Sequence, residues 1–183
     1  MEPTSHRTNL EDQIREAYGR VTYSQTTQVK QAELLKEKDT CLKWATIIAS
    51  ILTTGGILGF IILNTQYCAI FSVITSMVTL VISSILKSVD YNGQSKEHKN
   101  AADRLWPIRE EYVSLLIDFD TLTDEEIIER RDILQNHTGE IYADAPTTSE
   151  KSYKKAQKAL KYDEEQYFSK EELNKLLPER LRK

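Results

Sequence analysis

Residues 44–86 read WATIIASILTTGGILGFIIL, then NTQ, then YCAIFSVITSMVTLVISSIL, and this stretch decides the fold. It contains no Asp, Glu, Lys, Arg or His, although 28% of the chain is charged. The apolar runs 44–63 and 67–86 each hold about 20 residues, which at ~1.5 Å rise per residue span roughly 30 Å, the hydrocarbon thickness of a bilayer. The stretch therefore predicts a transmembrane hairpin that turns at residues 64–66.

The alternative is a buried helical hairpin at the centre of a soluble protein. Core helices seldom hold more than about 14 wholly uncharged residues, and the rest of a 183-residue chain is too short to cover two such helices. A cleaved signal peptide does not fit either, because the apolar run begins only at Trp44, after a polar segment.

Basic residues flank both apolar runs, whereas residues 64–66 between the runs are uncharged. The excess of Lys and Arg on one side of a membrane marks its cytoplasmic face. We therefore expect both termini to lie in the cytoplasm. The flanking basic residues are Lys30, Lys36, Lys38 and Lys43 before the first run and Lys87, Lys96, Lys99 and Arg104 after the second.

The net charge of -4 lies after the hairpin, because the seven acidic and seven basic residues before Trp44 balance. Such a chain lacks the basic character of a nucleic-acid-binding protein, so we expect no direct nucleic-acid binding. The predicted topology places Cys41 and Cys68 at opposite ends of the spans, too far apart for an intrachain disulfide. A bridge between Cys68 residues of two chains stays open.

Helical periodicity divides the remainder of the chain. Residues 1–9 are expected to be disordered, residues 10–43 to form an amphipathic cytoplasmic helix that continues into the first span, and residues 87–183 to form a cytoplasmic helical domain. The stripe of the first helix packs on other cytoplasmic helices or on a second copy of the chain. It consists of Leu10, Ile14, Ala17, Val21, Ser24, Gln28, Ala32 and Leu35.

The region after the hairpin contains a turn signal at Asn92-Gly93 and a second apolar stripe, in which Pro107 should kink the helix or start a new one. That stripe comprises Ala101, Ala102, Leu105, Ile108, Tyr112, Leu115, Leu116 and Phe119. Since no segment alternates with the period of a β-strand, the predicted fold class is an all-α membrane protein.

Capping boxes and breaks predict three further helices. Thr123 and Glu126 open a helix at Asp124 whose apolar residues are Ile127, Ile128, Leu134 and Ile141. A helix over residues 150–161 follows, with Tyr153, Ala156 and Leu160 on one side. The last capping box, at residues 169–172, opens a short helix that Pro178 ends.

Nothing in the sequence indicates catalysis, a metal or a cofactor. The histidines, His6, His98 and His137, stand alone, and the motifs of metalloproteases, hydrolases and phosphate-binding loops do not occur. The carboxylates read as solvated helix faces and helix starts. We therefore expect a protein that is not an enzyme.

Hydroxyl and glycine residues mark the surfaces of the two spans. The hydroxyl residues share an arc of about 60° on each span, and the glycines of the first span are expected on the opposite side, facing a neighbouring helix. Folding the hairpin about Thr65 sets Thr53 near the depth of Met77. The candidate pore-facing residues are Thr46, Ser50, Thr53, Ser72, Ser76, Thr79 and Ser83, and the candidate packing residues are Gly55, Gly56 and Gly59.

Two explanations of the hydroxyl residues remain open. They can serve helix packing, because small hydroxyl side chains allow close approach and bond to the carbonyl four residues earlier. Alternatively, the hydroxyl faces of several hairpins line a polar path, which requires a homo-oligomer because two helices cannot enclose water.

One cluster in the cytoplasmic domain is a candidate anion surface, formed by four lysines on one helix face. These are Lys151, Lys154, Lys155 and Lys158. The alternative is a solvated face that pairs with nearby carboxylates; the functional interpretation is contact with a nucleotide, an acidic partner or anionic lipid headgroups.

The chain resembles the SLATT proteins, prokaryotic two-transmembrane effectors named for association with nucleotide-synthesising and nucleotide-sensing partners. The resemblance extends from Leu10 to Arg182 and is closest to the subgroup found beside reverse transcriptases. It is carried by residues 17–23 (AYGRVTY), 98–109 (HKNAADRLWPIR), 145–146 (AP), 152–156 (SYKKA) and 176–182 (LLPERLR).

The resemblance implies a role in bacterial antiviral defence, in which a sensor partner or its product triggers perforation of the inner membrane and kills or arrests the infected cell. It implies no catalytic residues. The lipid bilayer, other copies of the chain and a nucleotide-synthesising, nucleotide-sensing or reverse-transcriptase protein are the expected partners. The alternative is a non-conducting membrane scaffold that recruits a cytoplasmic enzyme.

Overall fold

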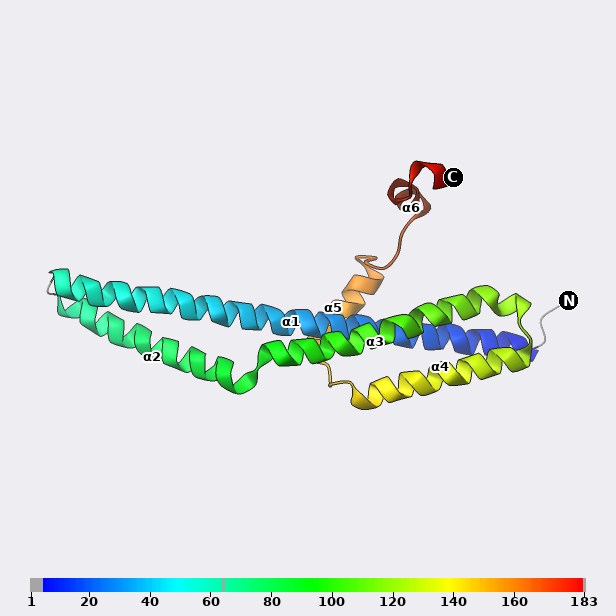
Figure 1. Cartoon of the computed structure of the whole chain (residues 1–183), viewed down its shortest axis with the longest axis horizontal. Helices are drawn as coiled ribbons and strands as arrows, with labels where there is room; N and C mark the ends of the chain where they lie inside the picture. Colours follow the sequence, from blue (N-terminus) through cyan, green and yellow to red (C-terminus); the bar gives the residue numbers. More distant parts are fainter. Residues whose placement is uncertain (1–4, 64, 183) are drawn as a thin grey trace. The chain divides into compact units, whose positions relative to one another are not determined.

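The computed structural model describes residues 5–63 and 65–182, and in these ranges the chain forms helices and no β-strand (Figure 1). The all-α prediction is confirmed. The elements are α1 (Ser5–Leu63), α2 (Gln66–Val89), α3 (Tyr91–Asp118), the 3₁₀ turn η1 (Phe119–Thr121), α4 (Asp124–Asp144), α5 (Glu150–Lys161), α6 (Lys170–Leu176) and the 3₁₀ turn η2 (Glu179–Leu181).

The helices form two compact units. One, here called the bundle unit, consists of the described parts of Met1–Lys30 and Ala101–Lys183. The other, the hairpin unit, consists of the described parts of Gln31–Asn100. Both α1 and α3 therefore contribute residues to each unit. The prediction that the first helix continues without a break into the first span is confirmed, because α1 ends only at Leu63.

The start of α1 differs from the prediction. Residues 1–4 of the segment expected to be disordered lie outside the described residues, and the expectation is wrong for the rest, because α1 begins at Ser5. Arg7 explains the earlier start. Its guanidinium donates a hydrogen bond to Asp124 Oδ1 at 2.6 Å and lies 4.9 Å from the centre of the Phe119 ring, so contacts distant in sequence hold this turn.

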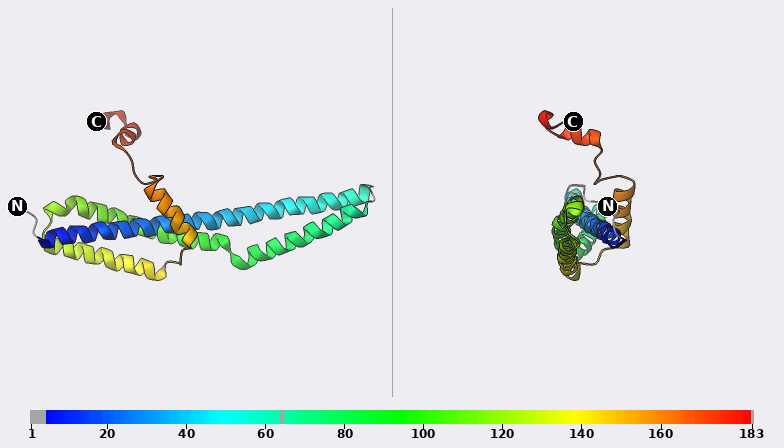
Figure 2. Two further views of the ribbon diagram at one scale, coloured as in Figure 1. Left: turned by 180° about the vertical axis from the view of Figure 1, so that it is seen from behind. Right: turned by 90° about the vertical axis from the view of Figure 1, so that its right-hand side faces the viewer.

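In the bundle unit α1, α3 and α4 lie side by side (Figure 2). Their apolar stripes pack into one core. The predicted stripes are confirmed with small differences: Ser24 of α1, Leu116 of α3 and Ile128 of α4 are only half-buried. The buried cluster consists of Leu10, Ile14, Ala17, Val21, Leu105, Ile108, Tyr112, Leu115, Phe119, Ile127, Leu134 and Ile141.

The junction between α2 and α3 is not where the sequence predicted it. The break lies at Asp90, with φ 37° and ψ 59°, and Asn92-Gly93 forms part of the first turn of α3. Aspartate tolerates this left-handed conformation, and Asp90 Oδ1 accepts a hydrogen bond from the Gly93 backbone N–H at 2.9 Å. One residue therefore ends one helix and caps the next.

Pro107 does not start a new helix, because α3 runs through it from Tyr91 to Asp118. A proline inside a helix removes one backbone hydrogen bond. The neighbouring packing compensates, since Leu105 and Ile108 on either side are both buried in the bundle core.

The three C-terminal helices begin as predicted. Thr123 Oγ1 accepts from the Glu126 N–H while the Glu126 carboxylate accepts from the Thr123 N–H, and residues 169–172 form the same reciprocal box before α6. The hydrogen bonds from Thr123 lower the pKa of the Glu126 carboxyl. Helix α5 occupies the predicted residues, Glu150–Lys161. These boundaries were predictable because caps are local features of the sequence.

In the hairpin unit, α2 returns along the second half of α1 (Figure 1). Asn64 of the predicted turn lies outside the described residues, and Thr65 precedes the first residue of α2. Helix α2 continues past the predicted end of the second span at Leu86 as far as Val89. The hairpin is thus made of two long antiparallel helices.

Candidate functional site

The surface of the hairpin consists of large apolar side chains. Exposed fractions reach 65% for Ile51, 77% for Ile62 and 69% for Leu80, and in the most apolar window of each long helix only 6% of the residues are buried. Exposed apolar area costs about 25 cal/mol per Å² in water. A buried core hairpin would show the opposite pattern, so this surface is built for lipid.

Inside the hairpin, glycine and hydroxyl residues form one seam between the helices. The hydroxyls of Thr53 on α1 and Thr75 on α2 are hydrogen-bonded at 2.8 Å. A Cβ added to Gly56 would collide with the Ser72 hydroxyl and lie 3.2 Å from a backbone carbonyl oxygen of α2. One at Gly59 would lie 3.4 Å from the Cys68 sulfur. The seam therefore requires a residue without a side chain at Gly56, whereas an added Cβ at Gly59 would make an ordinary van der Waals contact.

The predicted separation of glycine and hydroxyl faces is therefore wrong for two of the three glycines. At 100° per residue, Gly56 lies only about 60° from Thr53, close enough for both to face α2. Gly55 alone faces away, with no atom within 4 Å of an added Cβ. Helical spacing gives the faces of each span but does not identify which of them meet.

The seven candidate pore-facing residues fall into two groups. Thr46, Thr53 and Thr79 are half-buried and Ser72 is 5% exposed, whereas the side chains of Ser50, Ser76 and Ser83 are exposed. In this conformation Ser72 fills the seam beside Gly56 and also borders the groove described below.

Several of these hydroxyls are satisfied within their own helix. Ser50 donates to the Thr46 carbonyl at 2.8 Å, Ser72 to the Cys68 carbonyl at 2.9 Å and Thr79 to the Thr75 carbonyl at 2.8 Å. Such a hydrogen bond to the carbonyl four positions earlier lowers the free-energy cost of placing a hydroxyl in lipid. The depth prediction is two residues off, because Thr53 meets Thr75 and not Met77.

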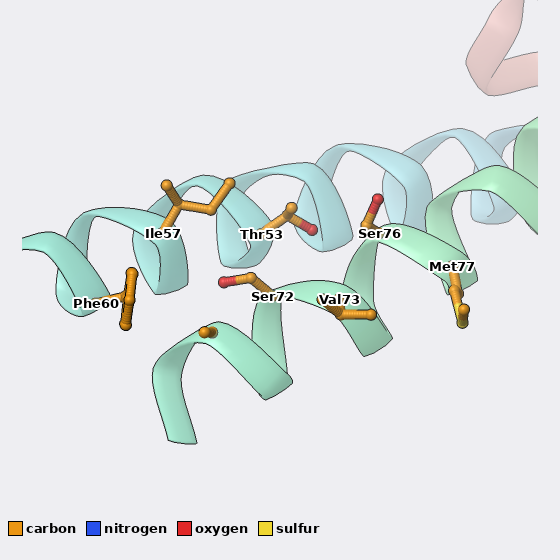
Figure 3. Close-up of a pocket in the computed structure, with 8 residues that line it drawn as sticks. Thr53, Ile57, Phe60, Ser72, Val73, Ser76 and Met77 are labelled. Atoms are coloured by element: carbon orange, nitrogen blue, oxygen red, sulfur yellow. The ribbon is translucent and has the colours of Figure 1, made fainter. Parts of the chain in front are cut away.

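A groove of about 500 Å³ runs along one side of the seam (Figure 3). Figure 3 shows Ile57 and Phe60 on α1 and Val73 and Ser76 on α2 around it. Phe60 and Ala69, the lining residues nearest the turn, are apolar, and the hydroxyls of Thr53, Ser72 and Ser76 lie farther from it. The lining consists of Thr53, Ile57, Phe60, Ala69, Ser72, Val73, Ser76 and Met77.

The hydroxyl character of this face continues beyond the groove, away from the turn. Ser50 and Thr46 precede Thr53 by three and seven residues and Ser83 follows Ser76 by seven, which places them on the same helix faces. We call this surface, including the groove, the groove face. The other sides of the hairpin present mostly isoleucine, leucine, valine and phenylalanine.

The candidate anion surface on α5 already contains carboxylates. Lys154 Nζ lies 2.6 Å from Glu150 Oε1, and Lys158 Nζ lies 3.4 Å from Asp163 Oδ2. The buried side of α5 also differs in part from the prediction, since Tyr153 is 50% exposed. The residues of α5 that are buried are Ser152, Ala156 and Ala159.

The sequence reasoning missed a polar network in the bundle unit. Arg109 on α3 donates hydrogen bonds to Gln25 on α1 and to Gln166, and the Gln166 amide donates to Thr26 at 2.9 Å. The network joins the segment after α5 to α1 and α3. Its signal in the sequence was a polar interruption of the α1 stripe, the buried residues Gln25, Thr26, Thr27 and Gln28.

The structure gives little support for a catalytic function. Among the described residues, no group of His, Cys, Asp and Glu is arranged to hold a metal ion. His98 is only 5% exposed, and burial lowers its pKa, an effect that the neighbouring Glu97 carboxylate opposes. His98 belongs to the packing of the hairpin unit outside the spans.

Comparison with known proteins identifies the family. Neither the curated proteins nor the solved structures gave a match. The family model for the SMODS and SLOG-associating 2TM effector domain, family 4, matches residues 10–172, which include the whole hairpin and most of the bundle unit. This match confirms the resemblance, and the two exposed apolar helices agree with the two transmembrane segments of the family description. The chain belongs to the SLATT family of two-transmembrane effector domains and is a membrane effector of a defence system.

Proposed function

We propose that this effector permeabilises the bacterial inner membrane by assembling several hairpins around a polar path. The observation that carries the proposal is the difference between the sides of the hairpin. Hydroxyls of both helices are found together on the groove face, whereas the other sides present mostly large apolar residues to lipid. Two helices cannot enclose water, so the path requires a homo-oligomer.

In this assembly the exposed hydroxyls Ser50, Ser76 and Ser83 face the path, and Thr53, Thr75 and Ser72 hold each hairpin together. A ring of hydroxyls provides water and ions with hydrogen-bonding groups without a fixed charge. Both explanations of the hydroxyl residues then apply. The seam hydroxyls serve packing between α1 and α2, and the hydroxyls of the groove face line the path.

The proposed topology places both termini in the cytoplasm. Lys43 and Trp44, the latter 60% exposed, stand at the start of the first span, and Lys87 stands at the end of the second. Tyr67, 81% exposed, lies beside the turn. Basic and aromatic residues concentrate at membrane interfaces, with the basic ones on the cytoplasmic side.

The trigger comes from a partner in this proposal. The family description names association with SMODS and SLOG proteins, and the resemblance points to nucleotide-synthesising, nucleotide-sensing or reverse-transcriptase proteins. The bundle unit, including the Arg109 network and the lysines of α5, supplies the surface for such a signal. Because α1 has residues in both units, a change in the packing of its first half can alter the hairpin.

A leakage assay tests the proposal. The full chain is reconstituted at rising protein-to-lipid ratios into vesicles of phosphatidylethanolamine and phosphatidylglycerol that contain a self-quenching dye. A high density of the chain in the membrane favours assembly by mass action even without the partner, so we expect leakage that rises steeply with protein density. Ser76→Leu should reduce it roughly tenfold, because a bulky apolar side chain favours dewetting of a narrow path.

The matched control is Val78→Leu, two residues away on another side of α2. It should leave leakage unchanged, because Val78 is 46% exposed and its added methylene group would face lipid. The proposal fails if no leakage occurs at any protein density, or if Ser76→Leu and Thr79→Leu both leak like the unmodified chain.

A second candidate function is a non-conducting scaffold that recruits a cytoplasmic enzyme. The favouring observation is the C-terminal segment, whose apolar side chains are exposed: Leu176 is 71% exposed and Leu181 53%. An amphipathic helix of this kind is a common ligand for a groove on another protein. The scaffold predicts that an unrelated two-span anchor can replace residues 44–86 with protection against infection retained; the proposed pore predicts that protection is lost.

A further inference from the structure

We infer that the apolar part of the groove, lined by Ile57, Phe60 and Val73, is the docking site for the hairpin of a second copy of this chain. The inference rests on the proposed assembly and specifies the surface through which two hairpins meet. It assigns contact residues that differ from the exposed serines proposed to line the path.

The first argument is that a groove in a membrane surface has to be filled. The space of about 500 Å³ is open to the surroundings of the hairpin, and Ile57 and Val73 at its sides are 47% and 57% exposed. In a bilayer either a lipid chain or another helix occupies it. Close packing of side chains is the main source of association between membrane helices, so a groove favours a helix that fits it.

The second argument is continuity with the interface inside the hairpin. Thr53 and Ser72 belong both to the seam and to the groove lining. A helix placed in the groove would therefore extend the existing contact between α1 and α2 to a third helix.

The third argument identifies the occupant as a second copy. The groove face carries no charge from Thr46 to Phe60 or from Ala69 to Ser83, so it suits a span that is also uncharged, and the hairpin itself is such a span. Two copies inserted in the same direction are related by a rotation about the membrane normal. Residues of equal depth then meet, and in a two-fold pair the two grooves face each other.

Cysteine cross-linking in membranes tests this geometry. In a chain with Cys41→Ala and Cys68→Ala, single cysteines are introduced by Ile57→Cys in the groove and by Gly55→Cys on another side of α1 at nearly the same depth. An added Cβ at Gly55 meets no atom within 4 Å, so this control fits without rearrangement. We expect oxidation to produce roughly fivefold more covalent dimer from Ile57→Cys than from Gly55→Cys, as a specific helix interface requires.

A second pair of cysteine variants, on α2, keeps the test informative if one variant on α1 fails to assemble. Val73→Cys lies in the groove and Val78→Cys outside it, and the same preference for the groove position is expected. Equal or stronger cross-linking at Gly55→Cys and Val78→Cys would overturn the inference, and so would no dimer from either groove position, which would leave the groove to lipid.

Dye leakage measured on the same variants before oxidation separates this inference from the proposed function. Groove-specific dimers without leakage would support the proposed interface and contradict the proposed pore. Leakage without groove-specific dimers would keep the pore and reject this interface.

Discussion

Gly56 is the residue on which the packing of the hairpin depends most directly. A methyl group at this position meets the Ser72 hydroxyl and a backbone carbonyl of α2, and the carbonyl cannot move without moving the helix. We predict that Gly56→Ala destabilises the hairpin by about 1–3 kcal/mol, the usual cost of overpacking. The measurement is unfolding of the full chain in detergent, followed by Trp44 fluorescence in a Trp106→Phe background.

Gly55→Ala is the matched control for Gly56→Ala. It adds the same methyl group to the neighbouring position, where no atom lies within 4 Å. Since alanine favours a helix over glycine by up to about 1 kcal/mol, Gly55→Ala should be neutral or stabilising. Equal destabilisation by the two variants would show that the seam does not pass through Gly56.

His98 predicts a dependence of stability on pH. Burial lowers its pKa in the folded chain, so the unfolded chain binds a proton first as the pH falls. Stability should therefore be unaffected by His98 above its unfolded pKa of about 6.5 and decrease progressively as the pH falls from there towards the lower folded pKa.

The measurement for His98 is denaturation of the chain and of His98→Gln at pH 8 and pH 5.5. The variant should lose less stability between the two pH values, because glutamine does not titrate. His137→Gln, a change at an exposed histidine, serves as the control and should follow the unmodified chain. The same loss in His98→Gln would assign the acid sensitivity to other groups.

At the scale of elements, local signals in the sequence were the reliable ones. Thr123 and Ser169 marked the starts of α4 and α6, because the partners of a capping box lie three residues apart. The α2–α3 junction was misplaced because Asn92-Gly93 is a turn signal by composition, whereas Asp90 uses a less common conformation stabilised by its own side chain.

Contacts between distant segments were the ones that the sequence could not provide. Arg7 and Arg109 were not singled out, because nothing near them in the chain indicates Asp124 or Gln166 as partners. The hydroxyl and glycine positions in the spans were found, but which of them face each other depends on the rotation of each helix. The groove on one side of the seam also depends on that rotation, so the sequence alone could not predict it.

The junction at Asp90 leads to a prediction about the two helices that it separates. Asp90→Val should destabilise the junction by about 1–2 kcal/mol, because a β-branched residue resists the left-handed conformation and cannot cap Gly93. Asp90→Asn should be close to neutral, since asparagine tolerates this conformation and keeps an acceptor oxygen. Thermal melts of both variants in detergent check the difference, and equal melts would argue against a fixed junction.

For the whole molecule, the two units differ in how they treat apolar residues. The bundle unit buries its apolar stripes around Tyr112 and Leu105, whereas the two spans of the hairpin unit expose most of their large apolar side chains. Only a chain with one unit in water and the other in lipid satisfies both patterns. The folding of this protein is therefore inseparable from its insertion into a membrane.

The insertion has a direction, and the cysteines of the chain offer a way to measure it. Basic residues on both flanks of the hairpin predict that both termini and Cys41 lie on the cytoplasmic side, with Tyr67 on the opposite side. Two chains with a single cysteine each are compared. One carries Cys68→Ala and keeps Cys41, which is exposed in the structure. The other carries Tyr67→Cys, at a side chain that is 81% exposed, together with Cys41→Ala and Cys68→Ala. A membrane-impermeant maleimide added to intact spheroplasts should label the cysteine at position 67 and spare Cys41. Labelling of Cys41 should appear only after the membrane is permeabilised. The opposite result, in which Cys41 is labelled in intact spheroplasts and position 67 is protected, would reverse the topology. The bundle unit would then lie outside the membrane, where no cytoplasmic trigger could reach it.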